Sequence, residues 1–104
     1  MNDTEFVIDL GPADRIREYH VRSRGKIISF MVQYENFFRN RWLPVARYDS
    51  AHGFAHRDLY DAKVRTTKTP LFMRDYNQAL TFAELDLKAN WRIYRERFVK
   101  GVGE

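Results

Sequence analysis

Runs rich in apolar and β-forming residues recur through the first 60 residues and are separated by turn residues. They predict strands at about residues 6–10, 15–22, 26–37, 42–48 and 54–60, and the third of these alternates with a period of two. The longest segment is expected to turn four apolar side chains to one face of a sheet: Ile28, Phe30, Val32 and Tyr34. Gly25 and the pair Arg39-Asn40 fall between segments and predict tight turns. The pattern therefore indicates an antiparallel meander.

Pro44 and the residues that end at Pro70 depart from this pattern. Pro44 lies inside the fourth segment and has no N–H for a strand ladder, so it indicates either an edge strand or a bulge. Residues 61–70 are rich in Lys and Thr and are expected to form a loop. The segment after them, from Pro70 to Met73, is expected to form either a brief last strand or an apolar clip.

From about Asp75 the apolar period changes to 3.6, which is typical of an amphipathic helix. One stripe then contains Leu80, Ala83, Leu87, Trp91, Tyr94 and Phe98. Two capping boxes compete for its start, Asp75 with Gln78 and Thr81 with Glu84, and the earlier one is favoured. Gly101 is the expected C-terminal stop.

These elements predict an α+β fold in one domain that spans residues 1–104. An antiparallel β-meander of four to six strands, over about residues 5–73, packs against one long C-terminal α-helix over about residues 75–99. A 44% hydrophobic and 15% aromatic composition is sufficient for a compact core.

The composition excludes several classes of protein. Without cysteine there is no disulfide framework, no Cys-ligated zinc and no thiol nucleophile. No apolar run reaches the roughly 20 residues that span a bilayer, and the acidic start lacks the form of a signal peptide, so a cytoplasmic protein without a membrane partner is expected. The net charge of +4, carried largely by arginine, suits phosphate groups and makes RNA a candidate partner.

Polar chemistry is concentrated in the segment from Arg47 to Tyr60, which holds two of the three histidines. One hypothesis is a divalent metal site formed by four residues of metal-ligating type: Asp49, His52, His56 and Asp58. The even offset between the histidines places both on one face of a continuous strand, but Gly53 lies between them and can break that register. The spacing permits a metal site without specifying one.

A second hypothesis is metal-free cleavage of a phosphodiester. His52 and His56 would then act as acid and base, while Arg47, Arg57 and Tyr48 would hold the phosphate and stabilise the charged transition state. This chemistry requires two imidazoles on either side of one phosphate.

A third interpretation is structural. Asp49 and Ser50 would turn the chain by bonding nearby backbone amides, and Arg47 and Arg57 would pair with Asp49 or Asp58 across the hairpin. The two histidines would then be half-buried hydrogen-bonding groups.

Three polar residues outside this segment are expected to have structural roles. His20 is expected to be an ordinary strand residue whose face the sequence leaves open. Asp86 and Asn90 are i,i+4 neighbours on the predicted helix and are expected on its solvated face.

The run Arg-Tyr-Asp-x-Ala-His-Gly-x-x-His-Arg-Asp, from Arg47 to Asp58, resembles a signature of small uncharacterised prokaryotic proteins. The likeness covers about residues 15–99 and implies the same meander and C-terminal helix. More distantly, the strand order, this turn and the paired histidines are similar to TumE-type toxins of toxin–antitoxin modules. That resemblance implies a growth-inhibiting protein neutralised by a cognate antitoxin, with Asp49, His52 and His56 in the matching region.

Three functions follow as expectations. The first is a toxin-like RNA-directed protein that uses the histidines of the turn. The second is a non-catalytic binding or assembly module that acts through a sheet edge, as a homodimer. The third is a metal-dependent enzyme that uses the Asp/His turn.

Overall fold

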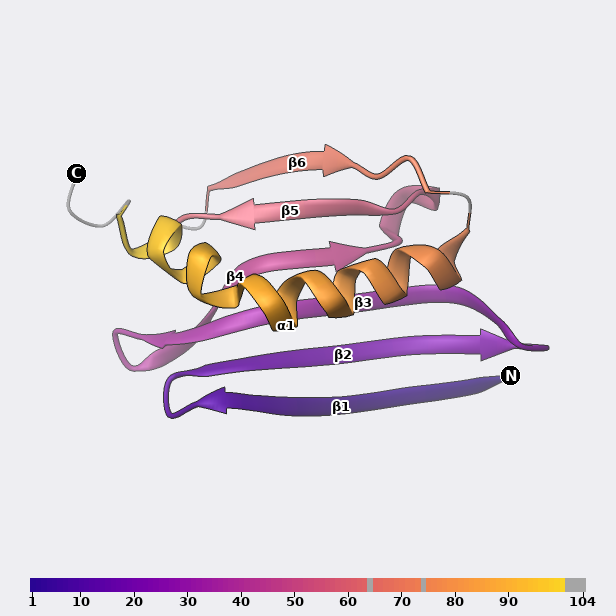
Figure 1. The fold of residues 1–104 in the computed structure, drawn as a ribbon, viewed down its shortest axis with the longest axis horizontal. Coiled ribbons are helices and arrows are strands. Elements are labelled where there is room, and N and C mark those ends of the chain that lie inside the picture. Colours follow the sequence, from indigo (N-terminus) through magenta and orange to yellow (C-terminus); the bar gives the residue numbers. More distant parts are fainter. Residues whose placement is uncertain (64, 74, 101–104) are drawn as a thin grey trace.

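The computed structural model describes residues 1–63, 65–73 and 75–100. Six strands form one antiparallel sheet in chain order: β1 (Asn2–Gly11), β2 (Asp14–Ser23), β3 (Lys26–Phe38), β4 (Arg41–Asp49), β5 (His56–Tyr60) and β6 (Thr66–Pro70). The helix α1 (Tyr76–Lys100) crosses one face of this sheet, over β3 and β4 (Figure 1). A short 3-10 turn, η1 (Ala51–Gly53), joins β4 to β5. The predicted α+β fold, a meander with one long C-terminal helix, is confirmed.

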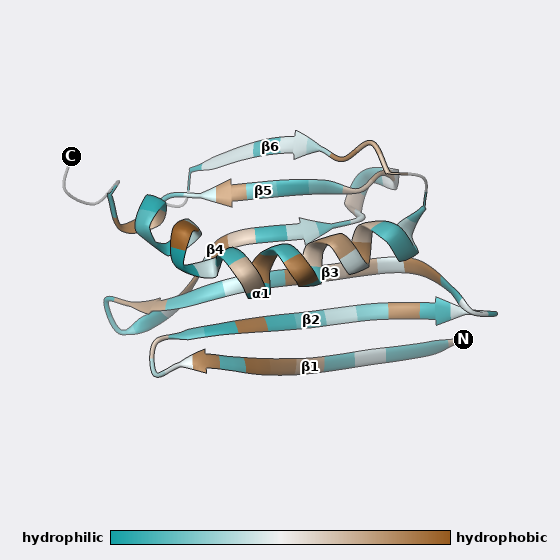
Figure 2. Cartoon of the chain, in the orientation of Figure 1, coloured by the Kyte–Doolittle hydropathy of each residue, from teal (hydrophilic) through white to brown (hydrophobic). Residues whose placement is uncertain are grey.

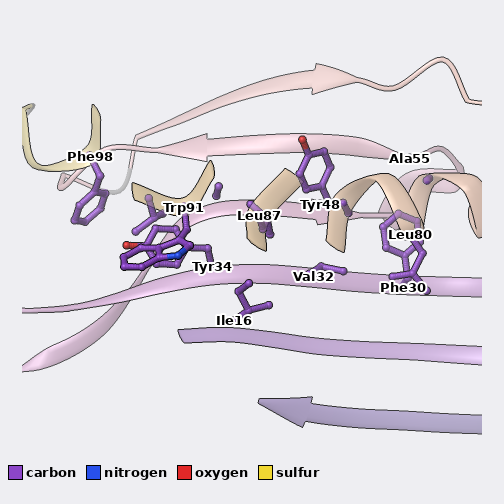
Figure 3. Packing of buried hydrophobic residues seen from close by; sticks show 14 of the residues in the cluster. Ile16, Phe30, Val32, Tyr34, Tyr48, Ala55, Leu80, Leu87, Trp91 and Phe98 are labelled. Carbon is purple, nitrogen blue, oxygen red and sulfur yellow. The ribbon is translucent and has the colours of Figure 1, made fainter. Parts of the chain in front are cut away.

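The core lies between α1 and the central strands, because the apolar stripe of the helix meets the large rings of β3 (Figure 3). Trp91 packs on Tyr34 with ring centroids 5.8 Å apart, and Phe98 packs edge-on against Phe38 at 5.9 Å. Leu87, at the centre of the stripe, is fully buried. Truncating such a side chain to alanine typically costs about 2–5 kcal/mol.

The start of α1 agrees with the earlier of the two predicted caps. The backbone N–H of Gln78 donates to the side chain of Asp75 at 2.8 Å, which satisfies one of the free amides of the first turn. One residue into the helix, Asn77 accepts a 2.8 Å hydrogen bond from the backbone N–H of Ile27 and so ties this end to β3. The predicted stop at Gly101 lies outside the described residues.

The two predicted tight turns are confirmed. In each, both central residues have positive φ: 53° and 77° at Arg24 and Gly25, and 53° and 67° at Arg39 and Asn40. Two-residue turns of this kind match the right-handed twist of the strands that they connect.

Pro44 lies beside a bulge in a central strand. The register of β3 with β4 jumps from Tyr34–Ala46 to Glu35–Pro44, so Val45 is an extra residue. Because a bulge lets a proline stand inside a sheet without breaking a ladder bond, β4 can lie between β3 and β5. The bulge alternative of the prediction is the correct one.

A second register jump corrects the prediction for Ile28. The pairing of β2 with β3 passes from Val21–Ser29 to Arg22–Ile27, and Ile28 has no partner in it. Its side chain is 46% exposed, whereas Phe30 is buried under the helix. Ile28 therefore does not share the face of Phe30, because the extra residue shifts the alternation by one position.

Residues 66–70, predicted as a loop, form β6 instead. This strand pairs with β5 and is exposed throughout, so it has none of the apolar alternation that marks a half-buried strand (Figure 2). The next segment acts as the predicted apolar clip: Leu71 and Met73 pack against the core, and the Leu71 N–H donates to the carbonyl of Ala55 at 2.9 Å. The fifth strand begins at His56 rather than at residue 54.

The sheet has two free edges, β1 and β6. The homodimer expected from a free edge stays a prediction. Within the described ranges, no helix combines the length and apolarity that crossing a membrane requires. We call the side of the sheet that α1 does not cover the open face.

Candidate functional site

The register of β4 with β5 divides the predicted site between the two faces of the sheet. Neighbouring residues in a strand point to opposite faces, and paired residues share a face. The open face therefore receives Arg47, Asp49, His56 and Asp58. The helix-covered face receives Tyr48 and Arg57, which are paired with each other. The structure thus brings together only part of the residues proposed for phosphodiester cleavage.

On the open face, Asp49, His56 and Asp58 converge. The Nε2 atom of His56 lies 2.9 Å from Oδ1 of Asp49 and 3.4 Å from Oδ2 of Asp58. One ligand atom from each of the three residues lies within 4.8 Å of the others. All three are buried, with His56 only 1% exposed. We call these three residues the Asp–His cluster.

The contacts of His56 define what its Nε2 atom can do. Its Nδ1 atom lies 3.3 Å from the carbonyl oxygen of Phe54, which can only accept a hydrogen bond. In the tautomer that has its proton on Nδ1, Nε2 keeps its lone pair and can bind a cation. The Lys68 ammonium lies 3.2 Å from Nε2 and 3.5 Å from Oδ1 of Asp58. This positively charged group is therefore next to both His56 and Asp58.

Asp58 has an oxygen with an incomplete set of partners. Among the residues that the structure describes, buried Oδ1 of Asp58 has no hydrogen-bond partner, and Lys68 approaches it only at ion-pair distance. Burying a carboxylate oxygen without a hydrogen bond is costly. A carboxylate oxygen in this environment can bind a cation.

Asp49 has a structural contact as well. Its Oδ1 accepts a 3.0 Å hydrogen bond from the N–H of Ala51, which confirms its predicted part in turning the chain. Ser50 instead bonds across to β3, where its hydroxyl accepts a 3.0 Å hydrogen bond from the N–H of Phe30. Arg47 lies 3.8 Å from Asp49, so the expected pair forms only as a loose one.

His52 stands apart from the three converging residues. It lies in η1 with a φ of 70°, next to Gly53 at 83°, and its side chain is exposed. Its ring centroid is 6.3 Å from that of His56, with 32° between the planes. Of the four residues proposed as metal ligands, His52 is the one that the convergent group does not include.

A chain of polar contacts extends across the open face from the Asp–His cluster. Arg15 and Arg17 each donate to Glu35 at 2.7 Å, and Gln33 links Glu35 to Arg47. Burial opposes ionisation of Glu35, but the hydrogen bonds from the two arginines and Gln33 outweigh it and lower its pKa. This chain holds Arg47 in place beside the cluster.

The helix-covered face has its own polar cluster, which joins β4 to α1. Asp86 accepts hydrogen bonds from Tyr48 at 2.6 Å, from Asn90 at 2.8 Å and from Tyr94. The prediction that Asp86 and Asn90 lie on a solvated face is therefore wrong. Burial and the contact with Asp86 raise the pKa of Tyr48, so its hydroxyl stays protonated and donates to the helix. The nearby tyrosines outweigh burial and raise the pKa of Arg57.

His20 also lies on this face, which settles the orientation that the sequence left open. Its Nδ1 atom is 2.8 Å from Oε2 of Glu18, a side chain that is 1% exposed. Burial and the adjacent Glu84 carboxyl raise the pKa of Glu18 to about 8, although Lys88 acts in the opposite direction. The sequence signal for this buried carboxylate was its even offset from Ile16, because strand alternation places Glu18 on the same face as that buried residue.

An open depression of about 350 Å³ lies next to the Asp–His cluster. It is lined by residues of β2, β3, β4 and η1: Tyr19, Ser29, Phe30, Met31, Arg47, Asp49, Ser50 and Ala51. A larger hollow of about 660 Å³ lies elsewhere, around Phe82 and Leu85 near the start of α1. Of these two hollows, the smaller one shares a residue, Asp49, with the Asp–His cluster.

Comparison with known protein families gives a match over residues 1–104, to a domain of unknown function. Comparisons with curated proteins and with solved structures give no match. The chain belongs to the family DUF7718, a domain of unknown function.

Proposed function

We propose that this protein is a divalent-metal-dependent enzyme whose ion is bound by Asp49, His56 and Asp58. The observation that carries the proposal is the convergence of three ligand atoms within 4.8 Å. Two carboxylates and one imidazole suit Mn²⁺, Fe²⁺ or Zn²⁺.

The distances within the Asp–His cluster support this proposal. Two atoms that bind the same ion at about 2.0–2.2 Å are about 3.0–3.5 Å apart in octahedral or tetrahedral geometry. Nε2 of His56 lies 2.9 Å and 3.4 Å from the nearest oxygens of Asp49 and Asp58. The two histidine–aspartate pairs therefore already have the spacing that one ion requires, and the ligand oxygens of the two aspartates lie within 4.8 Å of each other.

The second contact of His56 supports the same assignment. Metal-binding histidines usually donate their other ring N–H to a carbonyl or carboxylate, which fixes the orientation of the ring. Here Nδ1 faces the carbonyl of Phe54 at 3.3 Å and leaves Nε2 directed at the two aspartates. The Lys68 side chain is 45% exposed and flexible, so its ammonium can give way to an ion.

Three protein ligands are the number found in catalytic rather than structural metal sites. The remaining coordination positions would hold water and substrate, and the ion would supply Lewis-acid chemistry. Arg47, held beside Asp49 by Gln33, would balance the negative charge of a substrate on the open face.

Titration calorimetry of EDTA-treated protein with MnCl₂ and with ZnCl₂ tests this proposal. We expect one ion per chain in the wild type and at least about tenfold weaker binding in Asp58→Asn, which keeps the shape of the side chain but removes its charge. The matched control is Asp3→Asn, an exposed carboxylate on β1, which should bind like the wild type. Equal affinity of the wild type and Asp58→Asn, or no binding at all, would overturn the assignment.

A toxin-like RNA-directed protein is a second proposal. It is supported by the resemblance to TumE-type toxins and by the 6.3 Å between the rings of His52 and His56. It is less favoured because the His56 ring is 1% exposed and both of its nitrogens already have partners. Controlled expression in a bacterial host decides it: growth arrest by the wild type that is relieved in the double variant His52→Ala/His56→Ala, at matched soluble levels, supports a toxin, and unimpaired growth in both contradicts it.

A further inference from the structure

We infer that the substrate of the proposed metal centre is a nucleotide unit, with its base on Tyr19 and its phosphate between Arg47 and the ion. This inference rests on the proposed function and adds a substrate class to it. It is carried by the depression beside the Asp–His cluster, which has an aromatic end and a charged end.

The strand register sets the two ends of this depression. Tyr19 pairs with Met31, and Met31 pairs with Asp49, so the three side chains form one row across the open face. Asp49 pairs in turn with His56, which places the cluster at the end of the row. Strands are about 4.8 Å apart, so β2 lies roughly 10 Å from β4. A mononucleotide, from its base to its phosphate, spans such a distance.

The aromatic end suits a flat, apolar group. Tyr19 is 36% exposed although it lies in the middle of a strand, and Met31 lies beside it in the lining. An exposed tyrosine ring can stack with any nucleobase, because every base has a π-face. A methionine side chain adapts to the ring that packs on it.

The charged end suits a phosphate. The Arg47 side chain is 34% exposed, and its Nε atom donates to Gln33 at 2.7 Å, which fixes the direction of the guanidinium group. Its Nη1 atom is 3.8 Å from Asp49, too far for a hydrogen bond, so its N–H groups can donate to an anion. Arg17 lies in the same cross-strand row as Arg47, and together with Arg15 it leaves a net positive charge around the carboxylate of Glu35.

Binding of adenosine 5′-monophosphate to the Mn²⁺-loaded protein tests the inference, with inorganic phosphate and adenosine as separate probes. We expect the nucleotide to bind at least about tenfold more tightly than either part alone, because it uses both ends of the depression. In Tyr19→Ala the nucleotide should lose at least about fivefold in affinity while phosphate binding is unchanged. Tyr19→Phe, which keeps the ring, is the matched control and should bind like the wild type.

Titration of each variant with MnCl₂ separates this inference from the proposed function. Unchanged Mn²⁺ affinity with a nucleotide that binds no better than phosphate, or with a Tyr19→Ala variant that binds the nucleotide normally, overturns the nucleotide inference alone. Failure of the wild type to bind Mn²⁺ overturns the metal centre. In that case nucleotide binding in EDTA that still depends on Tyr19 would leave the nucleotide site standing.

Discussion

The hydroxyl of Tyr48 donates a 2.6 Å hydrogen bond to Asp86, 38 residues further along the chain. This bond ties the end of β4 to the middle of α1. Because Asp49 follows Tyr48 directly and points to the opposite face, the bond also holds the strand that presents the Asp–His cluster. The packing of the helix and the geometry of the open face are thus coupled through one strand.

Replacing Tyr48 by phenylalanine should lower the free energy of unfolding by about 1–2 kcal/mol, because Asp86 then loses a partly buried, charge-assisted hydrogen bond. Chemical denaturation of both proteins measures this difference. Tyr60→Phe is the control, since no hydrogen bond from the Tyr60 hydroxyl is present in the described part of the chain; it should change stability by less than about 0.5 kcal/mol. Equal effects in the two variants would show that the bond to Asp86 contributes nothing.

The stability of the protein should fall as the pH rises from 5 to 8. Burial and Glu84 raise the pKa of Glu18 from 4.5 to about 8, so the folded state keeps a proton that the unfolded state releases near pH 4.5. Over this window the folded state binds more protons, and the free energy of unfolding decreases, by up to about 4 kcal/mol. Denaturation curves at several pH values measure the slope.

Glu18→Gln isolates this contribution, because glutamine mimics the protonated carboxyl and does not titrate. The variant should be less sensitive to pH than the wild type between pH 5 and 8. His20 and Lys88, which also lie near Glu18, are unchanged in it. Parallel curves for the two proteins would show that Glu18 ionises normally in the folded state.

His52→Gly should stabilise the protein by about 0.5–1 kcal/mol, because His52 has a φ of 70° that glycine adopts without a steric penalty. The same variant should bind Mn²⁺ with unchanged affinity, since His52 is outside the convergent ligand group. Thermal denaturation and calorimetry on one preparation give both values. Weaker metal binding would restore His52 as the fourth ligand that the sequence predicted.

Lys68→Met should raise the affinity for a divalent ion by at least about tenfold. The variant removes the ammonium that lies 3.2 Å from Nε2 of His56. A divalent ion then neither competes with the ammonium for Nε2 nor is repelled by its positive charge. Lys26→Met, at the exposed start of β3, is the matched control for the loss of one charge. Equal metal affinity in both variants would show that the ammonium does not occupy the ion's position.

Much of the fold was predictable because strand and helix periods differ so clearly in this chain. The stripe from Leu80 to Phe98 and the turns at Gly25 and Asn40 appear in the structure as the sequence indicates. The errors have local causes. Ile28 is displaced by a bulge, and the Thr/Lys strand from Thr66 to Pro70 carries no apolar alternation to detect.

The composition of the site was only partly predictable. Strand alternation already separates Arg47 from Tyr48 and His56 from Arg57, so these residues cannot all serve one open cleft. The pairing of Asp49 with His56 depends on the length of the turn between them, and the sequence does not give that length. The contact of Asp86 with the sheet depends on how the helix is rotated about its axis, which packing decides.

We propose above that Asp49, His56 and Asp58 bind one divalent ion. The most direct test is a crystal structure of the protein grown with MnCl₂, with data collected where manganese scatters anomalously. We expect one anomalous peak about 2.0–2.3 Å from Nε2 of His56 and from an oxygen of each aspartate, with the Lys68 ammonium displaced. A structure with Lys68 still against His56 and no peak at the cluster would contradict it.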